Sequence, residues 1–181
     1  MFRKKRMTII FAIILLCFCC SGCANIRNYQ YNRGVKEKSG PIAEKVLYTI
    51  TSKDEELLYE MFSQENKDGC DIKGQIRDLF VGVQVEDLSF DKISQYENGG
   101  GISYRDGRIA EYSFGYTYNQ IFDSNEQEYI ISFGYCIVDE NRPETEGLVS
   151  LLVARIERND PNNHNNYVIV DEYSVGLDKY E

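Results

Sequence analysis

The residues that could carry acid–base chemistry are few, and they lie between positions 87 and 164. Such chemistry needs a titratable group poised by burial, and Asp87, Asp91 and Glu111 are the carboxylates that could enter a cavity. The single histidine, His164, stands among asparagines with no apolar support, which predicts a solvated turn residue. Strand carboxylates usually lie on the wet face of a sheet, and no Ser-His-Asp or Cys-His constellation follows from the spacing. We therefore assign no catalytic residue from the sequence.

Oxygen-bearing side chains alternate in the Asn-rich stretch near the C-terminus, as the ligands of a calcium loop do. The alternating residues are Asp160, Asn162 and His164. The run lacks the glycine that a calcium loop needs at its sixth position, and Asp171 stands where a bidentate glutamate would be expected. We therefore expect a hairpin loop, and neither a metal site nor a cofactor.

The first twenty-three residues carry chemistry of another kind, because they predict export and attachment to a membrane. Residues 3–6 are all basic, and the apolar run 7–18 is shorter than the ~20 residues of a transmembrane helix, so residues 1–22 are interpreted as a signal peptide. The run ends in Cys20-Ser21-Gly22-Cys23, which resembles the lipobox of bacterial lipoproteins, with Cys20 where leucine is usual. In that motif the last cysteine receives diacylglycerol and becomes the mature N-terminus. The alternative is an uncleaved anchor, and both place the chain at the cell membrane, on its extracellular face.

The composition of the remaining chain favours a single acidic domain. The 181 residues carry a formal charge of −9, and removal of the signal peptide, with four basic and no acidic side chains, makes it −13. A chain of this size buries enough surface to fold without a metal or a disulfide. Because an acidic surface repels phosphate backbones, nucleic acid is not an expected partner. Neutral, cationic or protein partners remain, as does a simple role of the charge in solubility.

Of the six cysteines, only Cys70 and Cys136 belong to the predicted folded part. Outside the cell they could form a disulfide, which would contribute about 4 kcal/mol in the chain-entropy model. The alternative is two buried thiols, since Cys136 lies in an apolar strand pattern where free cysteine is ordinary core filling. The sequence leaves both open.

The mature chain divides into a polar tether and a domain that begins with helices. Residues 23–40 show no sustained apolar period and predict a flexible coil between the lipid and the domain, which spans 41–181. Helical spacing follows Pro41, and Ser52-Lys53-Asp54-Glu55 matches a capping box at the start of a second helix. After a turn at 66–69, Asp71 can cap a third helix.

From Val83 onward the apolar pattern alternates, which predicts strands. The Asp106-Gly107 pair is typical of a two-residue hairpin turn. The segments 129–138 and 148–156 are apolar on both faces and are the candidates for central strands, and 167–173 is the last strand. Three helices followed by antiparallel strands predict an α+β fold.

A row of aromatic residues along the predicted sheet could line a pocket, because such rings supply contact area and tyrosine hydroxyls supply polar contacts. The alternative is that the rings pack the helices onto the sheet. The candidate lining residues are Tyr112, Phe114, Tyr116, Phe133 and Tyr135.

The order of helices and strands resembles the nuclear-transport-factor-2-like and cystatin-like cone, in which a curved antiparallel sheet wraps an N-terminal helix. Together with the lipobox, the segments 75–80, 128–133 and 143–148 resemble a Gram-positive lipoprotein family built on a domain of unknown function, the 5104 type. The resemblance implies fold and location. It implies no site residues, because its segments consist of ordinary core and turn residues.

Together these features predict a lipid-anchored cell-surface protein that acts as a binding or interaction module, with a small ligand or an envelope protein as its partner. One alternative is a small hydrolase or isomerase that uses a cavity carboxylate, such as Glu111, with a tyrosine, such as Tyr116. Another is an inhibitory partner of an envelope protein that uses a surface patch and no pocket.

Overall fold

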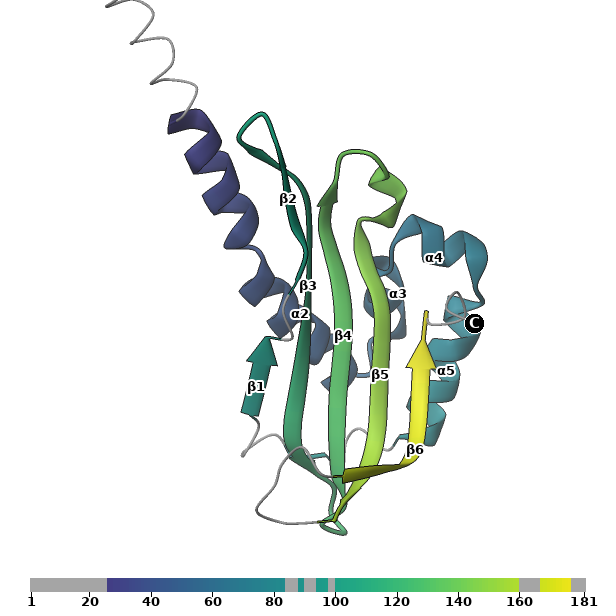
Figure 1. Cartoon of the computed structure of the whole chain (residues 1–181). Coiled ribbons are helices and arrows are strands. Elements are labelled where there is room, and N and C mark those ends of the chain that lie inside the picture. The colour runs from purple at the N-terminus through teal and green to yellow at the C-terminus, as the bar shows by residue number, and fades with distance from the viewer. Residues whose placement is uncertain (1–25, 84–87, 90–93, 98–99, 160–166, 177–181) are drawn as a thin grey trace, which may run out of the picture.

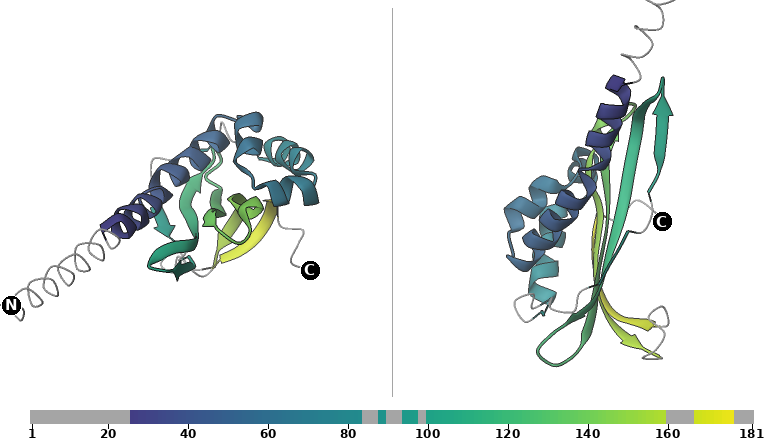
Figure 2. Two further views of the ribbon diagram at one scale, coloured as in Figure 1. Left: turned by 90° about the horizontal axis from the view of Figure 1, so that it is seen from above. Right: turned by 90° about the vertical axis from the view of Figure 1, so that its left-hand side faces the viewer.

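Helices occupy the first half of the chain and pack on one face of the antiparallel sheet that the second half forms (Figures 1 and 2). The computed structural model describes residues 26–83, 88–89, 94–97, 100–159 and 167–176. The helices are α2 (Ser39–Thr51), α3 (Glu55–Met61), α4 (Gln64–Gly69) and α5 (Ile72–Gly82), and residues 26–36 before them are also helical. The strands are β1 (Ser94–Glu97), β2 (Ile102–Arg105), β3 (Arg108–Phe122), β4 (Glu128–Asp139), β5 (Gly147–Arg158) and β6 (Tyr167–Val175), with the 3-10 helix η2 (Pro143–Thr145) between β4 and β5. The α+β prediction is confirmed.

The first two predicted helices are present, but the cap of the second was assigned to the wrong residue. Helix α2 begins two residues before Pro41. Helix α3 is capped by Asp54, whose side chain accepts a hydrogen bond from Leu57 N at 2.9 Å. Ser52 instead ends α2, and its hydroxyl donates to Tyr48 O at 2.8 Å. The predicted capping box fails because Ser52 still belongs to the previous helix.

The segment 66–69, predicted as a turn, lies in the short helix α4. Ser63 caps this helix by accepting a hydrogen bond from Asn66 N at 3.3 Å. The predicted cap of α5 is confirmed, because Asp71 accepts from Gly74 N at 3.0 Å. No membrane-spanning helix, in length and apolar character together, occurs in the described part of the chain.

The coil predicted before the domain is wrong from residue 26, because residues 26–36 are helical. This helix lies along the β2–β3 turn, where Asn32 Nδ2 donates to Gly107 O at 3.0 Å and Asn32 Oδ1 accepts from Ile109 N at 2.8 Å. Asn28, whose side chain also donates to this turn, lies four residues before Asn32 and therefore shares its face of the helix. The prediction looked only for an apolar period, so it missed a helix that is bonded to the hairpin by asparagine side chains.

The sheet contains six described strands in the order β1-β3-β4-β5-β6, with β2 also paired to β3. The predicted hairpin is confirmed, because Asp106 and Gly107 adopt φ values of 51° and 77° and connect β2 to β3. Such positive values fit the twist of the two strands. Strands β4 and β5 both have neighbours on each side, which confirms them as interior strands.

The main core lies between the helices and one face of the sheet, and the predicted aromatic row belongs to it. Tyr112, Phe114, Tyr116 and Phe133 are buried there. Phe114 and Tyr116 meet edge-to-face with ring centroids 5.5 Å apart, and Tyr116 stacks on Phe133 at 6.0 Å. A smaller cluster, formed by Ile130, Leu152, Ala154 and Ile156, lies apart from this core.

Candidate functional site

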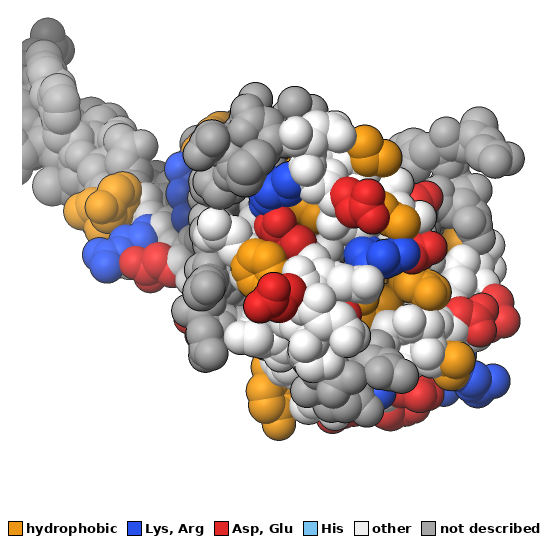
Figure 3. All heavy atoms as spheres, turned by 90° about the horizontal axis from the view of Figure 1, so that it is seen from below, with side chains coloured by type: hydrophobic (Ala, Val, Ile, Leu, Met, Phe, Trp, Pro, Cys, Tyr) orange, Lys and Arg blue, Asp and Glu red, His pale blue; other side chains and the backbone are white. Residues whose placement is uncertain are grey.

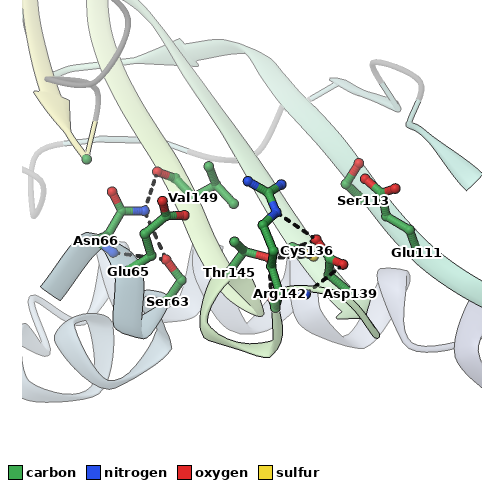
Figure 4. A pocket seen from close by; sticks show the side chains of 11 residues that line it. Ser63, Glu65, Asn66, Glu111, Ser113, Cys136, Asp139, Arg142, Thr145 and Val149 are labelled. Carbon is green, nitrogen blue, oxygen red and sulfur yellow. Dashed lines mark hydrogen bonds and ion pairs between the residues drawn. The ribbon is translucent and has the colours of Figure 1, made fainter. Parts of the chain in front are cut away.

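A polar cavity of about 410 Å³ extends across the strands at the end of the sheet where β3 begins and β4 ends (Figure 4). Its side chains come from α4, from β3, β4 and β5, and from the loop that contains η2. The lining residues are Ser63, Glu65, Asn66, Glu111, Ser113, Cys136, Asp139, Arg142, Thr145, Val149 and Gly176. Its volume lies in the range of small-molecule sites, although its lining is more polar than usual.

Asp139 fixes the loop on one side of the cavity. Its buried carboxylate accepts hydrogen bonds from the backbone N–H groups of Asn141 and Arg142, both at 3.0 Å, and from Arg142 Nε at 3.3 Å. Thr145 Oγ1 also lies 3.4 Å from Asp139 Oδ2. Burial acts to raise the pKa of Asp139, but the two backbone N–H groups and the Arg142 guanidinium outweigh it, so the pKa is lowered. The carboxylate is therefore ionised and structural.

Arg142 occupies the middle of the cavity. Its side chain is 62% exposed, and only Nε is held by Asp139. Figure 4 shows the guanidinium between the α4 residues at one end of the cavity and Glu111 with Ser113 at the other. No described residue bonds its two terminal nitrogens. A guanidinium held at Nε presents those nitrogens in a fixed orientation, which suits recognition of a carboxylate or phosphate.

At the α4 end, Asn66 ties the helix to β5. Its buried Nδ2 donates to Val149 O at 2.8 Å and lies 3.1 Å from Ser63 Oγ. Ser63 N in turn donates to Leu148 O at 3.0 Å. These bonds fix the position of this wall relative to the sheet, so it is built before any ligand arrives.

The cysteine in the cavity is not poised as a nucleophile. Burial raises the pKa of Cys136, and its sulfur lies 3.8 Å from the Thr145 hydroxyl, which acts in the opposite direction. A protonated thiol reacts poorly. Cys136 and Cys70 are both free, so the candidate disulfide between them is not formed.

Carboxylates outnumber basic groups in the cavity. Glu65, Glu111 and Asp139 face a single basic side chain, Arg142, among the described lining residues. Asp139 is already bonded to Arg142 and to the loop backbone. The other two carboxylates, Glu65 and Glu111, lie at the two ends of the cavity. Within the described residues no group of three or more His, Cys, Asp or Glu side chains is arranged to hold a metal ion.

Several residues singled out from the sequence do not meet in one site. Glu111 lines the cavity, whereas Tyr116 is buried in the helix-side core, because odd and even residues of β3 point to opposite faces. Of the aromatic candidates only Tyr135 lines a described cavity, a smaller one of about 260 Å³ bordered also by Glu60 and Glu146. The candidate residues Asp87, Asp91, Asp160, Asn162 and His164 lie outside the described residues.

Sequence reasoning missed the residues that shape the cavity. Asp139 and Arg142 lie between the predicted strands 129–138 and 148–156, and the sequence assigned neither of them a role. The order Asp-Glu-Asn-Arg-Pro does contain a local signal, because an aspartate at a strand end often accepts hydrogen bonds from the backbone two and three residues later. That signal could have predicted the turn, but not the Asn66 wall, which is far away in the sequence.

One protein family, described as a domain of unknown function (DUF5104), matches residues 45–157. The match covers more than half of the chain and includes every lining residue of the cavity except Gly176. No curated protein matches the sequence. The resemblance to this domain of unknown function is thereby confirmed, and the chain belongs to the DUF5104 family.

Proposed function

We propose that this chain is a lipid-anchored protein of the extracellular membrane face that binds a small zwitterionic ligand in the cavity around Arg142. The observation that carries the proposal is the guanidinium in the middle of a preformed polar cavity, held at Nε and without a described partner at its terminal nitrogens. The lipobox-like Cys20-Ser21-Gly22-Cys23 supports the anchor.

The charges of the cavity define the ligand class. Arg142 would pair with a carboxylate or phosphate group of the ligand, and Glu111 would receive its ammonium group. The hydroxyls of Ser113 and Thr145 can add neutral hydrogen bonds. Amino acids and short peptides carry both charges at a suitable size.

The same groups favour binding over turnover. General acid–base catalysis works best with a pKa near the working pH, yet the pKa of Asp139 is lowered and that of Cys136 is raised. The Glu111 and Tyr116 pair considered for a hydrolase lies on two faces of β3. An enzyme would need groups that the described cavity does not bring together.

A thermal-shift screen of the purified chain tests the ligand class. We would use free amino acids, dipeptides, and the N-acetylated and amidated forms of each hit. A ligand at about 100 times its Kd should add roughly 2.7 kcal/mol of stability, which is several degrees in Tm. Blocking either charged end of the ligand should abolish the shift.

Arg142→Gln should weaken binding by about 10- to 100-fold, because it removes a charge-assisted hydrogen bond. Arg77→Gln is the matched control, since Arg77 is exposed on α5 away from the cavity. Equal affinity of wild type and Arg142→Gln would contradict the assignment of the site. If no ligand of this class shifts the Tm, a protein partner becomes the better reading.

The anchor has a separate test. Cys23→Ser should move the protein from the membrane fraction to the medium, or block its processing, because the thiol that would carry diacylglycerol is gone. Cys17→Ala, within the apolar run, is the control that should leave the distribution unchanged. Normal maturation and membrane retention of Cys23→Ser would refute lipidation at this residue.

A further inference from the structure

Two segments of this acidic chain carry an excess of positive charge, although Arg105 in one of them lies 3.8 Å from Glu140 after strand β4. Residues 26–38 and 102–108, together called the basic end, carry six basic side chains against two acidic ones. The rest of the mature chain carries ten basic against twenty-seven acidic side chains. The basic residues of this end are Arg27, Arg33, Lys36, Lys38, Arg105 and Arg108.

The two segments form one surface because the first helix is bonded to the hairpin. Asn28 Nδ2 donates to Asp106 O at 3.0 Å, and the Asn32 amide bonds the same turn. The Arg108 guanidinium also lies 4.2 Å from the centre of the Tyr31 ring. Both views in Figure 2 show the helix beside the hairpin at one extremity of the molecule.

Apolar and aromatic side chains are exposed on this same surface. Tyr29 is 67% exposed and Tyr104 is 54% exposed, and both line a shallow hollow of about 480 Å³ together with Arg33 and Lys36. Each of the two segments also exposes an isoleucine, Ile26 in the first and Ile102 in the second. Tyrosine and basic side chains together are typical of the membrane–water interface.

We propose that the basic end lies against anionic lipid headgroups and so fixes the orientation of the domain on the membrane. The inference rests on the proposed tether, because Cys23 is separated from residue 26 by only two residues, a reach of at most about 10 Å. Residue 26, where the basic end begins, therefore stays within a distance of the anchor that is comparable to the Debye length of about 8 Å at physiological salt.

With the basic end against the headgroups, the rest of the molecule extends away from the membrane. Strand β3 runs away from the hairpin for 15 residues, about 50 Å. At the far end the charges are mixed, with basic and acidic side chains next to one another (Figure 3). Arg155 is bonded to Asp171 there, and Arg158 to Glu128. This end has no comparable excess of positive charge among the described residues.

Two introduced cysteines, labelled one at a time while Cys136 stays buried, measure the orientation in vesicles. The chain, purified from membranes in detergent, carries Cys70→Ser with either Ser103→Cys in the basic end or Asn125→Cys at the β3–β4 turn. Each is labelled with an environment-sensitive dye and reconstituted into vesicles of phosphatidylcholine alone or of phosphatidylcholine with phosphatidylglycerol. We expect the Ser103→Cys dye to report an apolar, lipid-quenchable environment only with phosphatidylglycerol, and the Asn125→Cys dye to stay in water in both.

Charge-reversal variants test whether the basic side chains cause the proposed orientation. Each basic side chain near an anionic surface favours the bound orientation about fivefold, so Arg27→Glu with Lys36→Glu should lower the ratio of bound to free orientations by at least ~25-fold. Lys45→Glu with Arg77→Glu makes the same change in net charge at exposed sites outside the basic end, and it should retain the signal.

Equal signals in both kinds of vesicle, or equal losses in both double variants, would overturn the proposal. So would a response of the Ser103→Cys dye to soluble poly(glycerol phosphate) but not to anionic vesicles, which would identify a wall polymer as the occupant. Flotation of the same samples tests the tether separately. A chain that floats without a composition-dependent signal refutes the orientation alone, and a chain that does not float refutes the tether as well.

Discussion

Asp139 is the residue that shapes the candidate site, although it does not meet the ligand in the proposed mode. Its carboxylate receives two backbone N–H groups and the Nε atom of Arg142. The bond at Nε restricts the conformations of the Arg142 side chain before a ligand binds. Part of the entropy cost of binding is thus met by folding.

The lowered pKa of Asp139 predicts a dependence of stability on pH. Because the folded protein holds this proton less tightly than the unfolded chain, the carboxylate stabilises the fold above its ordinary pKa of 3.8 and loses that effect as the pH falls through the lowered value. Asp139→Asn should therefore be less stable than wild type at about pH 7, and the difference should narrow below 3.8.

Urea unfolding at a series of pH values measures this difference. Asp78→Asn, at an exposed position of α5, is the control and should stay close to wild type. A gap between wild type and Asp139→Asn that stays constant to the lowest pH would show that the side-chain shape, and not its charge, holds the loop.

The two free thiols should differ in reactivity. Cys136 is buried and its pKa is raised, whereas Cys70 is half-buried at the end of α4. A maleimide reagent should therefore modify Cys70 first in the native protein and reach Cys136 only on unfolding. Mass spectrometry of labelled peptides gives the order, and fast native labelling of Cys136 would contradict the burial.

At the scale of elements, the helix at 26–36 is the least expected part of the fold. It contributes Val35 to the main core, and the side chains of Asn28 and Asn32 donate hydrogen bonds to the hairpin turn. A helix of this length is marginal in isolation, so its stability must come from docking.

Asn32→Ala should loosen that docking, because it removes the bonds to Gly107 O and from Ile109 N. We expect a loss of about 1–3 kcal/mol. Gln30→Ala, at an exposed position of the same helix, also introduces alanine, with a smaller gain in helix propensity, and serves as the control. Hydrogen exchange should accelerate over 26–36 only in Asn32→Ala, and equal protection in both variants would refute the role of the amide.

At the scale of the whole molecule, one core joins the elements. Its buried residues come from the first helix, from α2, α3 and α5, and from β3, β4, β5 and β6. Shared burial of this kind favours a single cooperative unfolding transition. Far-UV circular dichroism, which reports helices and strands, and tyrosine fluorescence, which reports the aromatic row, should give the same urea midpoint. A separate early loss of helix signal would show that the helical layer folds independently.

The cavity and the basic end also share one extremity of the molecule. Residues 102–108 lead into β3, which begins at Arg108, and the cavity takes Glu111 from the start of the same strand. If both proposals hold, ligand is captured close to the membrane surface. The far hairpins would then be free for other contacts.

The sequence by itself determined the features that depend on neighbouring residues. The two apolar periods separated helices from strands, Asp71 capped its helix, and Asp106-Gly107 formed the hairpin, because each rests on local geometry. The same local reasoning failed at Ser52 and at 66–69, where a preceding helix and the neighbouring strand β5 changed the outcome.

Only the tertiary structure decided the site. It buried the aromatic row as core, left Cys70 and Cys136 unpaired, and brought α4 to the loop of Arg142. These outcomes depend on which segments, 40 or more residues apart, pack together. Strand alternation states that two side chains face opposite ways, but the packing of helices decides which face is core and which is open to a ligand.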